Sequence, residues 1–390
     1  MQQAHTSATH VAQMQSARQH QASLQAGFSI VELMVGIVLG LLTTLLISQV
    51  FLNAEGQKRT ATSGSDAQLN GALAMFSLQR DIQMSGYGLA TNPAGLGCAV
   101  KGQFSGTAIA PFTLAPVVIT TGASGAPDTI TLLSSSKDNY ALPMYVSENH
   151  TTATNYFVVR SSLGTAVGDT LVAIPETWDA TNWCSLVTAT SDAVSTTTTL
   201  SATYIPHATG GGSSWNQTGT TVFPVAGYAA ASTLVNLGTI NFRRYSVSGT
   251  QALQLTTMGT GGVTSSQELY PQIVTMKALY GRDTNADGVV DTYNTTASTT
   301  AAGWREVLSV RVALVARSGQ REKDIVTSAN PMWDVGNTGT GALTTSTCGS
   351  SKCITLNVDN PGNPADTEWK YYRYKVYDTV VPLRNMLWNS

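Results

Sequence analysis

The chain has 390 residues, a formal net charge of −2 and only 11% charged residues, far below the ~25% of ordinary soluble domains. Because it has no basic surplus, overall charge excludes it as a general nucleic-acid binder, and we expect no direct nucleic-acid partner. Its length is sufficient to bury one large hydrophobic core or two lobes.

The first predicted element is an apolar segment close to the N-terminus. Residues 28–52 are mostly apolar or small, and Glu32 is the only charged residue among them. At ~1.5 Å per residue, a helix of this length crosses a bilayer. An acid inside such a span costs ~2.5–3.5 kcal/mol, so we expect Glu32 to have a partner. A plain signal-anchor with a stray acid explains neither Gly27 nor the residue order that follows it.

The residues around Glu32 resemble the class III leader junction of type IV pilins and type II secretion pseudopilins, in the run Gly27-Phe28-Ser29-Ile30-Val31-Glu32-Leu33-Met34. The resemblance implies that a membrane prepilin peptidase removes residues 1–27 by cutting after Gly27, and that Phe28 is then N-methylated. It also implies that Glu32 pairs with the terminal ammonium of a neighbouring subunit. Two opposite charges that are each costly in hydrocarbon offset one another in such a pair.

The charges that flank the span oppose the orientation expected for such a protein. Residues 1–26 contain a single Lys or Arg, Arg18, whereas Lys58 and Arg59 follow the span. Since Lys and Arg usually mark the cytoplasmic side, this bias argues against a cytoplasmic leader. The junction motif outweighs the bias, and a start at Met14 would give a shorter leader.

A second helical segment, residues 53–88, follows the span. Apolar residues recur there at spacings of three and four and predict one apolar face, made of Leu69, Leu73 and Phe76, with Met75, Leu78 and Ile82 beside them. We expect the helix to end at Gly86-Tyr87-Gly88. The pattern therefore predicts one long helix from about residue 28 to about residue 85, with a bend favoured at Gly56 and Gly64, whose second half packs on a head.

Beyond residue 91 the sequence predicts strands. Short β-branched runs bounded by Gly, Pro and Ser occur at 128–133, 156–160, 168–174, 239–245, 273–280, 308–314 and 372–376. The alternation in 308–314 predicts a strand with one buried face. The triple glycine Gly210–Gly212 is the candidate boundary between two β lobes, residues 91–209 and 213–390. The predicted fold class is α+β, with a long N-terminal helix packed on a large antiparallel β head.

Residues 283–291 carry the strongest ligand pattern. Positions 1, 3, 5, 7 and 9 of a calcium loop are matched by Asp283, Asn285, Asp287, the carbonyl of Val289 and Asp291. Gly288 stands at the sharp turn, but position 12 is Asn294 rather than Glu, and the flanks are typical of strands. We expect a lone, β-flanked Ca²⁺ loop of modest affinity. The alternative is a turn whose Asp and Asn side chains bond to its own backbone.

The four cysteines are typical of a protein from an oxidising compartment such as the periplasm. They allow three pairings, among Cys98, Cys184, Cys348 and Cys353. Cys348 and Cys353 enclose a short turn-like segment, which favours their pairing and leaves Cys98 with Cys184. Zinc is disfavoured, because there is no Cys-x-x-Cys and no histidine nearby in the sequence.

The sequence gives little sign of catalysis, and we predict that the chain is not an enzyme. Ser134-Ser-Ser-Lys137 fits Ser-x-x-Lys, but it follows a strand and does not open a helix. His150 and His207 are far apart in the sequence, and we expect them to be surface or loop residues.

The C-terminal part resembles PilW-type minor pilins, in the segments Val274 to Asp291, Trp304 to Arg317 and Tyr374 to Asn385. The resemblance implies a type IV pilin-like fold and a low-copy subunit at the pilus tip. It implies partners among the other minor pilins, the major pilin and a PilY-type tip adhesin, and roles in twitching motility and cell adhesion. The chain would occupy the bacterial inner membrane by a single pass, head in the periplasm, before assembly. Alternatives are a minor pseudopilin of a type II secretion system and a membrane-anchored enzyme, which the missing catalytic cluster disfavours.

Overall fold

The computed structural model describes residues 27, 29–138, 142–193, 198–209, 215–259, 263–336, 346–359 and 365–387. Residues 1–26, Phe28 and the triple glycine Gly210–Gly212 therefore lie outside the described residues. The chain divides into two compact units, residues 1–58 and 59–390. Its fold is α+β, with one long N-terminal helix and several antiparallel sheets.

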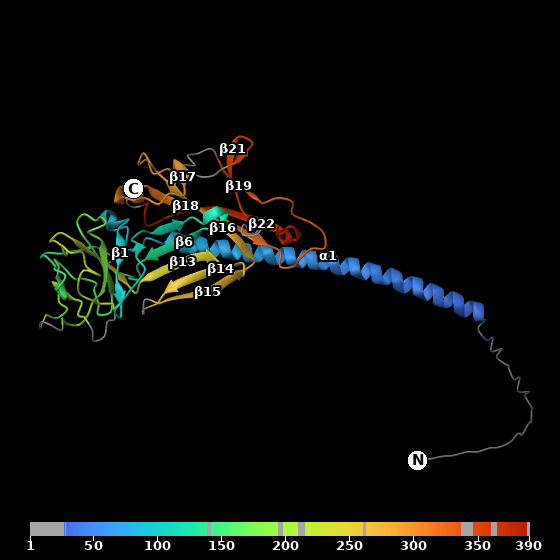
Figure 1. Cartoon of the computed structure of the whole chain (residues 1–390), viewed down its shortest axis with the longest axis horizontal. Coiled ribbons are helices and arrows are strands. Elements are labelled where there is room, and N and C mark those ends of the chain that lie inside the picture. Colours follow the sequence, from blue (N-terminus) through green and yellow to red (C-terminus); the bar gives the residue numbers. More distant parts are fainter. Residues whose placement is uncertain are drawn as a thin grey trace, which may run out of the picture. The chain divides into compact units, whose positions relative to one another are not determined.

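The long helix α1 runs from Ile30 to Met84 (blue, Figure 1). It is helical at Gly56 and Gly64 as well, where the sequence favours a bend. In the first unit, the segment Ile30–Lys58 is long and apolar enough to cross a membrane and is exposed, apart from the half-buried Glu55. Hydroxyl groups in this segment bond within the helix: Thr43 donates to the carbonyl of Gly40 (2.9 Å) and Thr44 to that of Leu41 (2.9 Å). An apolar environment requires such internal bonding of polar groups.

In the second unit, the buried stripe of α1 differs from the predicted one. Met75, Leu78 and Ile82 are buried as expected, together with Ala67 and Ala74, whereas the three residues of the predicted face are exposed. The exposed fractions are 59% for Leu69, 41% for Leu73 and 64% for Phe76. The buried stripe contains small residues because the sheet approaches closely: a Cβ at Gly71 would lie 2.1 Å from the Tyr377 ring.

Three sheets form most of the second unit. The six-stranded sheet has the order β4-β1-β10-β9-β12-β7, with β4 Phe112–Thr113, β1 Ala99–Lys101, β10 Cys184–Thr188, β9 Thr170–Ile174, β12 Thr233–Gly238 and β7 Met144–Tyr145. The five-stranded sheet has the order β15-β14-β13-β6-β5, with β15 Thr264–Pro271, β14 Ala252–Met258, β13 Asn241–Val247, β6 Thr129–Ser134 and β5 Val117–Thr120. The four-stranded sheet has the order β17-β16-β18-β22, with β17 Thr292–Asn294, β16 Ile273–Arg282, β18 Val307–Arg317 and β22 Tyr374–Pro382. Among these named strands, all pairings are antiparallel except β1 with β10. Figure 1 shows β13, β14 and β15 side by side.

Smaller elements complete the second unit. They are the three-stranded sheet β19-β21-β20 (Met332–Gly336, Ser351–Thr355 and Ser346–Cys348), the pairs β11-β8 (Tyr204–Pro206 and Tyr156–Val158) and β2-β3 (Gln103–Phe104 and Thr107–Ala108), the helix α2 (Ala301–Arg305) and the 3₁₀ turns η1 (Pro93–Gly95), η2 (Ala123–Gly125) and η3 (Glu368–Tyr371). Strands β6 and β12, from opposite sides of the triple glycine, join β13 and β9 respectively.

Strand β18 is buried on both faces, so the prediction of a single buried face was wrong. Val310, Val312 and Leu314 belong to the main core, which also holds Leu78 and Ile82 of α1. On the other face, Ala313 and Val315 belong to a separate cluster with Trp333 of β19, which covers this face. Alternation with small residues such as Ala313 cannot distinguish a covered face from an exposed one.

Candidate functional site

The N-terminal end of α1 presents Glu32 in its first turn. Glu32 and the neighbouring apolar side chains of the first unit are exposed. Gly27 and Ser29 precede the helix, and the Ser29 carbonyl accepts the first helical bond, from the N–H of Leu33 (3.0 Å). Phe28, the predicted methylation site, is not among the described residues. An acid on an exposed apolar helix is available to a partner helix and costly in lipid without one.

In the second unit, α1 is attached to the sheets by a polar cluster around Asp81. The Asp81 carboxylate, which is 8% exposed, accepts bonds from Arg243 Nη1 (2.5 Å) and from the hydroxyl of Tyr245 (2.5 Å), both on β13. Burial, and then the bond to Asp81, raise the pKa of Tyr245 well above its ordinary value, so this hydroxyl stays protonated and donates. No local sequence pattern predicts this cluster, because Asp81 lies more than 160 positions from Arg243 and Tyr245.

Replacing Asp81 with Ala is expected to lower the free energy of unfolding by about 2 kcal/mol or more, because Arg243 and Tyr245 lose a shared, largely buried acceptor. The measurement is chemical denaturation of the full chain in detergent. Asp66, an exposed acid of α1, provides the control, and Asp66→Ala should leave the free energy of unfolding within about 0.5 kcal/mol. Equal effects of the two substitutions would contradict the role given to Asp81.

The predicted calcium-type loop connects two paired strands. Strand β16 ends at Arg282 and β17 begins at Thr292, and these two residues face each other across the ladder. Residues 283–291 are therefore a hairpin loop. Its backbone adopts left-handed conformations at Ala286 (φ 62°) and Gly288 (φ 82°), and only glycine adopts such a conformation at no steric cost.

Asp283 organises this loop from a buried position. Its carboxylate accepts N–H bonds from Ala286 (2.7 Å), Gly288 (2.7 Å), Asn285 and Asp287. Burial works to raise the pKa of Asp283, but the four N–H donors outweigh it and hold this pKa below its ordinary value. Asp283 therefore remains ionised and fixes the turn.

The other predicted ligands lie on the exposed side of the loop. The side-chain amide of Asn285 donates to Asp287 Oδ2 (3.2 Å) and Asp291 Oδ1 (3.5 Å), which brings these three side chains together. Asp291 Oδ2 also accepts from the N–H of Thr284 (2.8 Å), and Val289 contributes its N–H to Asp287 (2.8 Å). Among the described residues, no group of three or more His, Cys, Asp or Glu side chains is arranged to hold a metal. The donors thus match calcium chemically, while the loop also stabilises itself through its own backbone.

His150 and His207 lie outside the named strands, as predicted for loop residues, but they are buried together and not at the surface. Their Nε2 atoms lie 2.9 Å apart, so that one neutral ring donates to the other. His150 stacks on Phe157 at a ring-centroid distance of 4.0 Å, within a cluster that includes Phe223 and Tyr228. Burial lowers the pKa of His150 to about 4; burial and the neighbouring His150 lower that of His207 well below its ordinary value. Both rings are therefore neutral at neutral pH.

This pair predicts a loss of stability in mild acid. An imidazole whose pKa is lowered by folding contributes stability that is complete above its unfolded value of 6.5 and is lost as the pH falls towards 4. In thermal melting of the full chain, the free energy of unfolding should be constant from pH 7 to 8. It should decline between pH 6.5 and 4 by about 1.4 kcal/mol per pH unit for each ring that titrates. In His150→Gln this decline should be smaller. An unchanged decline in that variant would assign it to other groups.

The cysteines form two disulfides, Cys98–Cys184 and Cys348–Cys353. Cys98 and Cys184 are fully buried in the main core, where β1 and β10 pair. Cys348 and Cys353 close the hairpin of β20 and β21. Each bridge joins segments that backbone pairing has already brought together.

Comparison with known proteins places this chain with pilus proteins. Residues 243–385 match the family model described as type IV pilus-assembly protein W, PilW. No curated protein and no solved structure matches the chain. The matched segment includes residues that contact the C-terminal end of α1. They include Arg243, the partner of Asp81, and Asn385, whose amide donates to the carbonyl of Ser85, directly after α1 (2.8 Å). This match supports a PilW-type pilus protein, with the similarity lying in residues 243–385.

Proposed function

We propose that this chain is a minor pilin that helps to initiate assembly of the type IV pilus and remains at its tip. Prepilin peptidase removes residues 1–27, and the new N-terminal residue, Phe28, is methylated. The chain resides in the inner membrane with its head in the periplasm, and then joins the other minor pilins, the major pilin and a PilY-type tip adhesin. Its head is a type IV pilin-like β structure.

One observation carries this proposal: an exposed apolar helical segment and a pilus-assembly match occur in one chain. The segment Ile30–Lys58 suits a bilayer first and the core of a helical fibre later, since both are apolar surroundings. In the second unit, Leu69, Leu73 and Phe76 form a further exposed apolar stripe on α1. Such a stripe on a helix is suited to packing against other subunits.

Deletion of the gene tests the proposal. We expect the deletion strain to lose surface pili and twitching, and the wild-type gene to restore both. Loss of exoprotein secretion with intact pili would instead favour the pseudopilin alternative. Normal pili and normal twitching after deletion would contradict the proposal.

The loop of residues 283–291 is proposed as a Ca²⁺ site that strengthens the head. Asp283, Asn285, Asp287, the Val289 carbonyl and Asp291 would supply oxygen ligands, and the ion would offset the repulsion among three acids on one turn. Ca²⁺ at 100 times its dissociation constant should raise the free energy of unfolding by about 2.7 kcal/mol. The check is thermal melting of the full chain with Ca²⁺ against Mg²⁺, using Asp287→Asn/Asp291→Asn as the control variant. No shift in melting temperature and no bound ion would end the proposal.

A further inference from the structure

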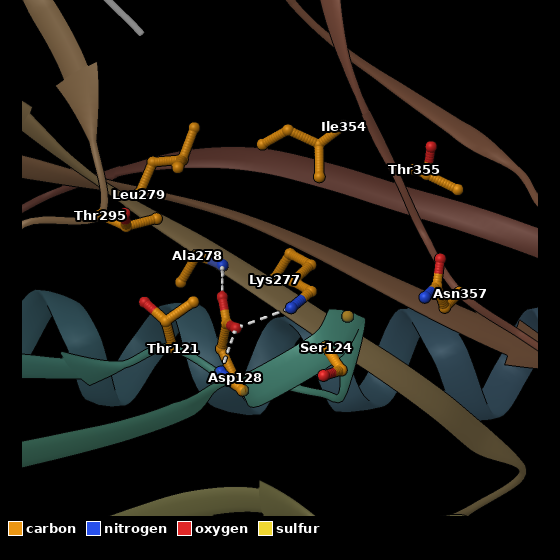
Figure 2. A pocket seen from close by; sticks show the side chains of 12 residues that line it. Thr121, Ser124, Asp128, Lys277, Ala278, Leu279, Thr295, Ile354, Thr355 and Asn357 are labelled. Carbon is orange, nitrogen blue, oxygen red and sulfur yellow. Dashed lines mark hydrogen bonds and ion pairs between the residues drawn. The ribbon is translucent and has the colours of Figure 1, made fainter. Parts of the chain in front are cut away.

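A cavity of about 450 Å³ lies beside β16 in the second unit (Figure 2). Its walls come from segments far apart in the sequence: the turn η2, strand β16, and strand β21 with the residues that follow it. Its lining combines hydroxyl groups and one amide with the apolar side chains of Leu279 and Ile354; the hydroxyls and the amide come from Thr121, Ser124, Thr295, Thr355 and Asn357. The cavity thus presents uncharged groups that both donate and accept hydrogen bonds.

A buried ion pair contributes the only charges among the described residues of the cavity wall. Lys277 Nζ lies 2.9 Å from Asp128 Oδ1, and the side chains are 10% and 1% exposed respectively. Lys277 also donates to the Ala126 carbonyl (2.6 Å), which leaves its third N–H without an acceptor among the described residues. Because the two charges cancel, the wall favours a neutral ligand over an anion or a cation.

The strand edge beside the cavity is already occupied. The N–H of Asp128 bonds to the Met276 carbonyl (2.8 Å), and the N–H of Ala278 bonds to Asp128 Oδ2 (3.0 Å; dashed in Figure 2). An extended peptide that added to a sheet here would need these two backbone groups of β16. The side chains must therefore supply the recognition, which favours a ligand rich in hydroxyl groups over a peptide strand.

A second cavity, of about 490 Å³, adjoins the first and shares Gly125 and Asn357 with it. Its lining includes the aromatic rings of Trp369, Tyr372 and Tyr374. It also includes the charged residues Arg317, Asp359, Asp366 and Glu368, so acids outnumber bases and an anionic ligand is disfavoured. Arg317 Nε and Asp359 Oδ1 are buried polar atoms that lack a partner in the part of the chain that the structure describes. Buried polar groups are normally bonded, so a donor and an acceptor are available to a ligand in this second cavity.

The Asn357 amide that the cavities share has room because residue 125 is a glycine. A Cβ at Gly125 would lie 2.1 Å from Asn357 Nδ2, and Gly125 has a φ of 83°. No side chain fits there without displacing Asn357. The amide therefore stands at the junction, next to the hydroxyl-lined cavity on one side and the aromatic one on the other.

We infer that the two adjoining cavities bind a short neutral oligosaccharide. One sugar unit would bond to the hydroxyls, to Asn357 and to the spare N–H of Lys277 in the first cavity. The next unit would pack on the aromatic rings of the second cavity and bond to Arg317 and Asp359. Such a site would let the pilus protein contact a glycan directly, in addition to its role in assembly.

The test uses the full chain, purified in detergent, on an array of neutral, sialylated and sulfated oligosaccharides. Maltotriose and chitotriose serve as soluble probes in saturation-transfer NMR. We expect binding to at least one neutral glycan, and little binding to charged analogues. An absence of binding to every neutral glycan, or a preference for charged ones, would overturn the inference. Because this measurement needs no pili, its outcome is independent of the deletion experiment.

Two variants locate the binding. Thr355→Trp places an indole at the first cavity from an exposed strand position, and Asn357→Ala removes the shared amide. Each is expected to weaken the binding of neutral glycans at least tenfold while the melting temperature is retained. Thr347→Trp, at an exposed position in the same three-stranded sheet and outside both cavities, is the matched control and should bind as the wild type does. Wild-type binding in both cavity variants would overturn the inference.

Discussion

The Glu32→Ala variant is expected to reach the membrane in normal amounts but to be at least tenfold depleted from sheared pili. Glu32 stands in the first turn of an exposed apolar helix. In the proposed fibre it pairs with the N-terminal ammonium of a neighbouring subunit, where either charge alone costs ~2.5–3.5 kcal/mol in hydrocarbon. A loss of only about 1.4 kcal/mol already changes an equilibrium tenfold.

The comparison needs a matched acid outside the predicted span. Asp66 is exposed, lies on the same helix and is charged, so Asp66→Ala changes net charge by the same amount. Immunoblots of membranes and of sheared pili measure both variants. Full incorporation of Glu32→Ala, or equal depletion of the two variants, would contradict the pairing.

Removing the Cys98–Cys184 bridge is expected to lower the free energy of unfolding more than removing the Cys348–Cys353 bridge does. The bridge closes a loop with a sequence separation of 86, whereas Cys348–Cys353 spans 5. In the chain-entropy model these loops correspond to about 4–5 and about 2 kcal/mol of stability. The first pair is also fully buried in the main core, so its replacement by Ala removes packing as well.

Denaturant unfolding of the full chain with Cys98→Ala/Cys184→Ala measures the first loss. The second double variant, Cys348→Ala/Cys353→Ala, is the control for the removal of a disulfide as such. A smaller loss in the first variant than in the second would contradict the assignment of Cys98–Cys184 as the main covalent support of the core.

Features encoded by neighbouring residues could be predicted from the sequence. An uninterrupted apolar run predicts the first half of α1, and β-branched runs predict strands such as β6, β9 and β18. The strand-like flanks of residues 283–291 likewise predict a loop beside strands, and the structure shows that this loop joins the two strands of a hairpin. These signals depend on contacts within a few positions, which a sequence displays directly.

Contacts between distant segments could not be predicted. His150 bonds to His207 across 57 positions and Lys277 to Asp128 across 149, and no local pattern connects them. The prediction of the buried face of α1 was wrong for a related reason. Large apolar residues such as Leu73 and Phe76 suggest a buried stripe, but close approach of Tyr377 to Gly71 selects a face with small residues. The larger residues remain exposed, available to other subunits.

The identity of the first residue of the native chain tests the account most directly, because incorporation into a fibre is proposed to depend on a free ammonium close to Glu32. Mass spectrometry of the protein isolated from native pili and membranes measures it. The account predicts a chain that begins at a methylated Phe28. A native chain that still carries residues 1–27 would contradict it.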